Sequence, residues 1–140
     1  MIGRLVICII LLDASLGCGT APTPEFKVPT EATNTKNPFP ATSDSIAEGK
    51  RSYRSSDCVI CHGVNGDGKG SESRNISMNL HDWRDPSVQA KFTDGDFFYI
   101  IDKGESADRG SMPPYHDLET PQQIWHMVNY IRSFAPLSVR

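Results

Sequence analysis

The sequence predicts a small all-α domain whose helices are joined by long loops. Three segments carry helical patterns with capping residues at their ends, and no periodic set of strands or internal repeat accompanies them. Connections rich in glycine and proline separate these segments. We expect three to five helices in total. Long loops in a domain of about a hundred residues commonly wrap a bound group.

Composition limits the function classes. With 140 residues the chain has room for one domain, which excludes a large multidomain enzyme. Asp and Glu number 17 against 14 Lys and Arg, the formal net charge is -3, and no dense run of basic residues occurs. A nucleic acid is therefore not an expected partner.

The N-terminal residues predict export. Arg4 precedes an apolar run over residues 5–12, and small residues lead from there to Cys18, which is the layout of a secretory signal over residues 1–17. The run is too short to span a bilayer as a helix, which takes about 20 residues. The sequence at Cys18 resembles the processing site of a bacterial lipoprotein, although Ser15 stands where an apolar residue is usual. Lipidation of Cys18 and simple cleavage of the signal both stay open.

Residues 18–43 predict a tether. Pro, Thr, Ala and Asn dominate this stretch, a composition typical of partly extended, mobile linkers. With a lipid on Cys18, such a leash would hold a domain formed by residues 44–140 near a membrane. We therefore expect the protein in the periplasm or on the outer face of a bacterial membrane.

The first helix is predicted from near Ser45 towards Cys58. Ser45 and Glu48 have the spacing of a capping box. Gly49 and Tyr53 are four residues apart and therefore share one face of this helix.

A second helix is predicted over residues 94–103. Thr93 or Asp94 can cap its start, and Gly104 suits the left-handed position at its end. Residues 97–101 are also consistent with a buried strand, because periodicity alone does not separate the two in a short apolar run.

The last helix has the clearest boundaries. Thr120 and Gln123 form a capping box around Pro121, which suits the first helical position, and Pro136 ends the segment. Its apolar stripe consists of Ile124, Trp125, Val128, Ile131 and Phe134.

Cys58, Cys61 and His62 form a C-x-x-C-H sequence, the signature of covalent c-type haem attachment. On a helical turn the two cysteines lie on one side, where each can form a thioether to the porphyrin, and His62 follows as the proximal ligand. Cys8 would leave with the signal and Cys18 would carry lipid, so no cysteine remains for a structural disulfide. One bound haem c is therefore the expected cofactor.

Other uses of the pair fit less well. A thioredoxin-like redox pair needs a βαβ setting, and structural zinc usually draws on a second cysteine pair. The sequence offers neither, and a chance match without a ligand is the third alternative.

The segment after the motif resembles the start of a phosphate-binding loop but departs from it. Residues 63–69 match G-x-x-x-x-G-K, yet Gly70 stands where Ser or Thr should hold magnesium, and no strand precedes. The glycines predict either a close approach of the backbone to the haem edge or a set of turns led by Asn65-Gly66.

An electron-transfer haem needs a second axial ligand. Met112 is favoured, because it lies in a loop whose direction is fixed by Pro113 and Pro114. Met78, also in a loop, is the main competitor, and Met127 on the last helix is more simply a core residue. The remaining candidates are His81, His116 and His126.

With these residues placed, the stretch from Ser45 to Phe134 resembles a class I cytochrome c. The likeness rests on Gly49 and Tyr53, on the C-x-x-C-H sequence, on Met112 before proline, and on Trp125 to Arg132 of the last helix. The resemblance implies a small cytochrome c fold in which the first and last helices cross at Gly49, near Val128 and Tyr130.

A narrower likeness points to lipoprotein cytochromes of respiratory complexes, of which alternative complex III is an example. It rests on residues 94–101, on residues 112–115 and on Ile124-Trp125. The expected partners are redox proteins or subunits of such a complex, with the membrane reached through the lipid anchor.

The resemblance implies a carrier of single electrons and not an enzyme. With both axial positions filled by His62 and Met112, no open site is left for oxygen or peroxide. The alternative is a haem peroxidase or gas-binding protein whose distal ligand is displaced. A module in which haem chiefly supports the fold is a further alternative.

Overall fold

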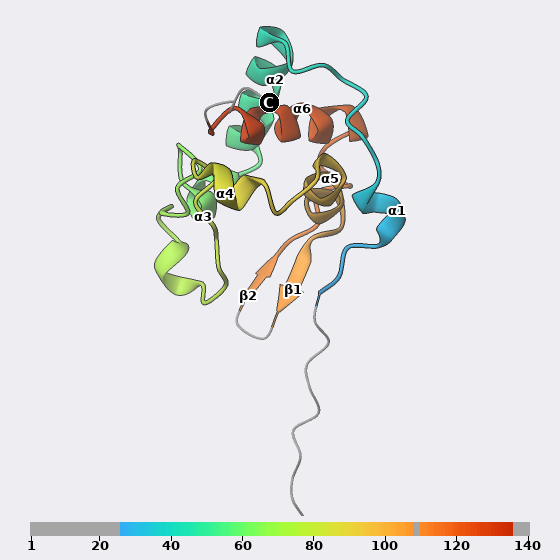
Figure 1. Ribbon diagram of the computed structural model, residues 1–140. Coiled ribbons are helices and arrows are strands. Elements are labelled where there is room, and N and C mark those ends of the chain that lie inside the picture. Colours follow the sequence, from blue (N-terminus) through green and yellow to red (C-terminus); the bar gives the residue numbers. More distant parts are fainter. Residues whose placement is uncertain (1–25, 108–109, 136–140) are drawn as a thin grey trace, which may run out of the picture.

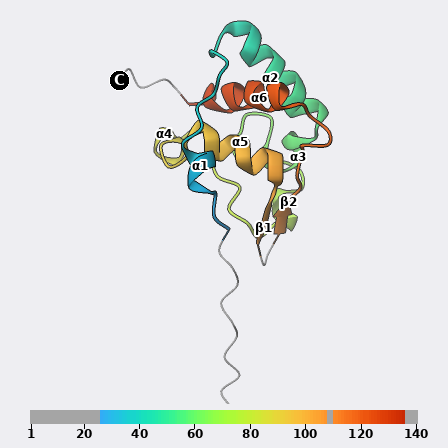
Figure 2. The same cartoon turned by 90° about the vertical axis from the view of Figure 1, so that its right-hand side faces the viewer.

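The computed structural model describes residues 26–107 and 110–135 (Figures 1 and 2). The predicted signal over residues 1–17 and the predicted lipid site at Cys18 lie outside the described residues. Within the described residues, no helix has the length and apolar character needed to cross a membrane.

The described chain forms six α-helices, one 3₁₀ turn and one two-stranded hairpin. The longer helices are α2 (Ser43–Ser55), α5 (Asp94–Lys103) and α6 (Pro121–Arg132). The short elements are α1 (Thr30–Thr33), α3 (Cys58–His62), the 3₁₀ turn Ser73–Asn75, α4 (Pro86–Gln89), β1 (Glu105–Ala107) and β2 (Gly110–Met112). The predicted all-α class is confirmed. The helices outnumber the expected three to five because single turns of four or five residues within the loops are too short to show a periodic pattern.

α2 starts three residues earlier than the predicted capping box implies. Thr42 has the extended backbone of an N-cap, and its side chain accepts a hydrogen bond of 3.2 Å from the Ser45 amide. Ser45 is thus inside the first turn, where its hydroxyl lies 2.7 Å from Nδ1 of His126 on α6. The predicted box at Ser45 and Glu48 is wrong because Thr42 already caps the helix.

The predicted caps of α5 and α6 are confirmed. Thr93 and Asp96 bond reciprocally at the start of α5, and Gly104 follows its last residue at φ 75°. Thr120 and Gln123 form the corresponding capping box of α6. Each helix therefore satisfies two amides at its N-terminus that would otherwise lack a partner.

α2 and α6 cross at Gly49. A Cβ at this position would lie 1.9 Å from the carbonyl oxygen of His126, so a residue without a side chain is required. Four residues further along α2, the Tyr53 ring meets the Tyr130 ring edge-on, with 5.3 Å between centroids. The predicted crossing is thus present. The Gly49 contact lies at His126 and Met127, just before the expected region around Val128 and Tyr130, and Tyr130 faces Tyr53 instead.

Residues 26–42 pack against the helices and do not form the predicted leash. The Asn37 side-chain amide donates to the Trp125 carbonyl at 3.1 Å and to the side-chain oxygen of Asn129 at 3.0 Å. α1 lies beside α5, where a Cβ on Gly95 would sit 1.9 Å from a carbonyl oxygen of α1. Composition alone does not predict this docking, because it does not show which polar side chains form hydrogen bonds to the helices.

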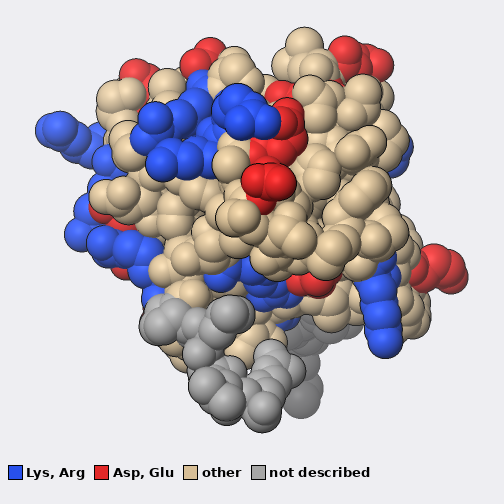
Figure 3. Space-filling view, turned by 90° about the horizontal axis from the view of Figure 1, so that it is seen from above, with Lys and Arg blue, Asp and Glu red and all other residues tan. Residues whose placement is uncertain are grey.

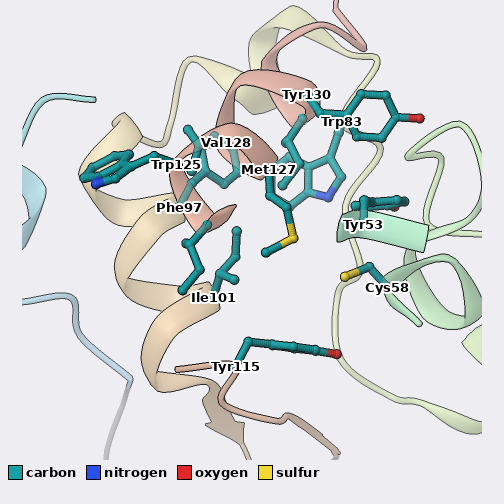
Figure 4. Packing of buried hydrophobic residues seen from close by; sticks show 12 residues of the cluster. Tyr53, Cys58, Trp83, Phe97, Ile101, Tyr115, Trp125, Met127, Val128 and Tyr130 are labelled. Carbon is teal, nitrogen blue, oxygen red and sulfur yellow. The ribbon is translucent and has the colours of Figure 1, made fainter. Parts of the chain in front are cut away.

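The core lies between α2, α5 and α6. Its most buried side chains are Ile124, Met127 and Val128 of α6. Trp83, from the loop before α4, meets Phe97 of α5 edge-on with 4.9 Å between ring centroids (Figure 4). Met127 is 1% exposed, which confirms the prediction that it packs in the core.

Surface charge is uneven despite the acidic total. Figure 3 shows Lys and Arg side chains gathered over α2, with acidic side chains beside them. The exposed basic residues of this helix are Lys50, Arg51 and Arg54, and Arg51 pairs with Glu48. Although the net charge is -3, one face of the molecule therefore carries a cluster of basic side chains.

Candidate functional site

α3 carries the predicted motif and begins just after α2 ends. Asp57, immediately before it, adopts the left-handed conformation at φ 58°, which turns the chain between the two helices. Cys58 is 8% exposed, Cys61 and His62 are half-buried, and Ile60 between the cysteines is 41% exposed. The short α3 thus presents its cysteines and histidine at the border of the core.

The glycine-rich loop after the motif caps α3. The amides of Gly68, Gly70 and Glu72 donate to the carbonyls of His62, Cys61 and Ile60 at 2.9, 3.1 and 2.8 Å. A five-residue helix has few internal hydrogen bonds, so these three external ones hold its shape.

Close contacts with other protein atoms require glycine at several positions of this loop. A Cβ on Gly70 would lie 2.2 Å from the Ile60 carbonyl oxygen, and Gly66, at φ 69°, lies against the Phe134 ring. The predicted turn is present at residues 64–65, while a close approach of this backbone to a haem edge stays a prediction.

A cavity of about 250 Å³ opens beside α3. One side is lined by Cys58, Cys61 and His62, and another by Met112 and the loop that follows it. Its remaining lining comes largely from residues 76–83, Phe92, Ile100 and Glu105. Predominantly apolar walls with a few polar groups are typical of a cofactor pocket.

A smaller recess of about 40 Å³ lies deeper in the core. Cys58, His62 and Met112 line both spaces. In Figure 4 the Cys58 sulfur points into the region bounded by Ile101 and Met127 on one side and by the Tyr115 ring on another. The motif and the Met112 loop therefore share one interior space.

A larger hollow of about 660 Å³ lies at the starts of α2 and α6 and contains none of these residues. It is open and lined mostly by polar side chains, among them Glu48, Arg51 and Gln122. The apolar cavity at α3 is the better site because it brings together the side chains with metal-ligating chemistry.

Comparison with protein families matches residues 46–135 to the cytochrome c family. The chain belongs to the cytochrome c family. Membership implies a covalently bound haem c. The cavity at α3 is a suitable site for it, because the C-x-x-C-H residues line this cavity. A comparison with curated proteins found no match.

Solved structures share the fold. The KustC0563 c-type cytochrome is 24% identical, with 63% of this chain and 98% of that chain covered and a TM-score of 0.52. The Kuenenia stuttgartiensis reducing HAO-like protein complex Kustc0457/Kustc0458 is 21% identical, with 81% of this chain and 52% of that chain covered and a TM-score of 0.57. This cytochrome therefore spans about half the length of the second chain. At these identities the likeness concerns the fold.

His62 suits an axial ligand. Burial lowers the pKa of its imidazole, which favours the neutral ring, and a neutral ring offers a lone pair to a metal. Its Nδ1 is buried and makes no hydrogen bond to any of the described residues. A buried imidazole with one unpaired ring nitrogen, at the wall of an apolar cavity, fits iron ligation.

Neither motif cysteine has the character of a redox thiolate. Burial, with the charges of Glu119 and Asp57, raises the pKa of the Cys58 thiol to about 12. Burial and the charge of Glu72 also raise the pKa of Cys61. Redox-active cysteines need a lowered pKa, so the thioredoxin-like alternative finds no support at this site.

The structure separates the candidates for the distal side. Met112, Met78 and His81 line the cavity, while Met127 reaches only the inner recess. His116 does not line it, and its Nδ1 lies 2.7 Å from the Asp102 carbonyl oxygen.

His126 on α6 also lies outside the cavity, and its ring is hydrogen-bonded to Ser45 of α2. Like His62, Met112 lines both the cavity and the recess, which neither Met78 nor His81 does.

Sequence reasoning missed several cavity residues. Tyr115 could have been found, because it follows Met112 and the two prolines directly. Trp83 and Glu105 carry no local signal: Trp83 comes from a loop, and Glu105 reaches the cavity only because β1 pairs with β2, which sets it opposite Met112.

Proposed function

We propose that this cytochrome carries single electrons through a haem attached at Cys58 and Cys61 and ligated by His62 and Met112. The supporting observation is that these four side chains line one apolar cavity. Bound haem supplies reversible one-electron chemistry at its iron. The role of the chain would be to hold the group through these four side chains and to exclude water from it.

The proximal side is fixed by the backbone. Hydrogen bonds from the glycine-rich loop hold the carbonyls of residues 60–62, and the Tyr53 hydroxyl donates to the Gly63 carbonyl at 2.9 Å. The backbone on both sides of His62 is thus hydrogen-bonded, which would help to position this residue to hold the haem.

The distal side is held by β2 and by the prolines. Met112 is the last residue of β2, opposite Glu105, and Pro113 and Pro114 limit the conformations of the chain that follows. A methionine held in a constrained loop would keep the sixth coordination position of the iron filled. A filled position favours an electron carrier over an enzyme.

Methionine variants test the proposal. Met112→Ala should keep covalent haem but lose the absorption band of sulfur-ligated ferric haem, because the sixth position opens. Met78→Ala is the matched control, since Met78 lines the same cavity and should keep the band.

Three results would contradict the assignment. An unchanged spectrum in Met112→Ala with a lost band in Met78→Ala would transfer the role to Met78. An unchanged spectrum in both would point to His81. Rapid carbon monoxide binding by the reduced unmodified protein would support the displaced-ligand alternative of a gas-binding protein or peroxidase.

We also propose that the protein is exported and anchored outside the cytoplasm through lipid on Cys18, where redox proteins are its partners. The name of one structural neighbour, a reducing HAO-like protein complex, supports a setting among redox subunits. Mass spectrometry of the N-terminus of the native protein tests the anchor. Subunits that co-purify from detergent-solubilised membranes test the partners, and a respiratory complex such as alternative complex III is one candidate.

A further inference from the structure

Glu119 is a buried carboxylate whose role the proposed function does not explain. It is 7% exposed and directly precedes Thr120, the N-cap of α6. Its Oε2 accepts a hydrogen bond of 3.1 Å from the Ser52 hydroxyl, and its Oε1 accepts one from the Ser56 hydroxyl. Ser52 lies in the last turn of α2 and Ser56 is its C-cap, so both stand just before the haem-binding segment.

The carboxylate has no cationic partner among the described residues; its side-chain partners are two neutral hydroxyls. Glutamate is almost never this buried without a compensating charge, because removal of a carboxylate from water is costly. The dipoles of the two hydroxyls offset part of that cost.

The charge acts on the attachment site. Ser56, whose hydroxyl donates to the carboxylate, lies two residues before Cys58, and the Cys58 sulfur is 3.9 Å from the Ser56 carbonyl oxygen. In keeping with this position, the charge of Glu119 is among the causes that raise the pKa of the Cys58 thiol. Glu72 also lies beside the motif, since its amide donates to the Ile60 carbonyl at 2.8 Å, but Glu72 is exposed to solvent. Water screens an exposed charge far more strongly than a buried one.

We propose that Glu119 is a buried negative charge that lowers the reduction potential of the haem, and that Ser52 and Ser56 hold it in place. The proposal rests on haem attachment at Cys58 and Cys61. The oxidised haem carries one positive charge more than the reduced haem, so a nearby negative charge in a medium of low dielectric stabilises the oxidised form.

Paired glutamine variants test this by potentiometric titration of the protein with haem attached. Glu119→Gln keeps the shape of the side chain and removes the charge, so its midpoint potential should shift to a more positive value. Glu72→Gln is the matched control and should shift much less. Glu119→Asp keeps the charge and should lie nearer to the unmodified protein than Glu119→Gln does.

Equal shifts in the two glutamine variants, no shift in Glu119→Gln, or a shift to a more negative potential would overturn the proposal. If Glu119→Gln does not fold, Ser56→Ala is the second test. That variant keeps the carboxylate and removes one dipole directed at it, so the potential should become more negative. An unchanged or more positive potential in Ser56→Ala would also overturn the proposal.

Failure of the attachment proposal would look different. In that case the unmodified protein itself would lose its haem on denaturing gels. The glutamine variants are compared only in protein that retains haem under these conditions, so the two failures are distinguishable.

Discussion

The Tyr53 hydroxyl donates a hydrogen bond of 2.9 Å to the carbonyl of Gly63, the residue that follows His62. Tyr53 is 2% exposed and its ring lies against Tyr130 and Phe134. The aromatic packing of α2 on α6 therefore fixes the backbone at the end of the haem-binding motif.

Tyr53→Phe should lower the free energy of unfolding by about 1 kcal/mol, because the Gly63 carbonyl loses the Tyr53 donor and keeps only the 3.2 Å bond from the Gly66 amide, while the ring remains. Denaturant unfolding measures the change. Tyr99→Phe, at a half-buried position on α5 beside Phe26, is the control and should cost less. Equal losses in the two variants would mean that the Gly63 bond contributes little.

Gly49→Ala should destabilise the protein by about 1–3 kcal/mol, since the added Cβ would lie 1.9 Å from the His126 carbonyl oxygen and the helices must separate. Thermal unfolding of the haem-loaded protein measures it. Lys50→Ala changes the exposed neighbour on the same helix and should leave stability nearly unchanged. A neutral Gly49→Ala would show that the crossing is looser than described.

Asn37→Ala should lower the free energy of unfolding by about 1–3 kcal/mol, because its side chain bonds to the Trp125 carbonyl, the Asn129 side chain and the Phe39 amide. Asn34→Ala, at an exposed position after α1, is the control. If both variants unfold alike, residues 26–42 do not stabilise the helices and the leash would be the better description.

Stability should fall steeply as the pH rises above about 10. Burial raises the pKa of Tyr115 to about 12, with the charges of Cys58, Cys61 and Asp57 adding to it where they are ionised. Between about 10 and about 12 the unfolded chain releases a proton that the folded chain keeps. Folding therefore loses up to about 1.4 kcal/mol per pH unit from this group.

Tyr115→Phe should flatten this dependence when denaturant unfolding is compared at pH 9 and pH 11. Tyr53, whose pKa burial also raises, would keep part of the slope in that variant. A slope equal to that of the unmodified protein would show that Tyr115 ionises normally in the folded state.

Local sequence signals were enough for α5, for α6 and for the haem motif. The caps at Thr93 and Thr120 act within one turn of the chain, so their spacing alone predicts the starts of α5 and α6. Family membership confirms the cofactor that the C-x-x-C-H sequence predicts. The ligand roles of His62 and Met112 stay predictions, supported by their shared cavity.

Features that depend on distant partners were not predictable. The start of α2 was misplaced because Ser45 looks like a cap in sequence yet bonds to His126 of α6. The docking of residues 26–42 depends on Asn129, about ninety positions away along the chain. The burial of Glu119 likewise depends on serines 63 and 67 positions away.

The family match starts at residue 46, which lies inside α2. A protein shortened to that boundary would lack the Thr42 cap and also Asn37, Phe39 and Pro40, which are hydrogen-bonded to Asn129. The folding unit therefore begins upstream of the start of the family match and includes at least Asn37. Any domain transplanted into another protein should carry these residues with it.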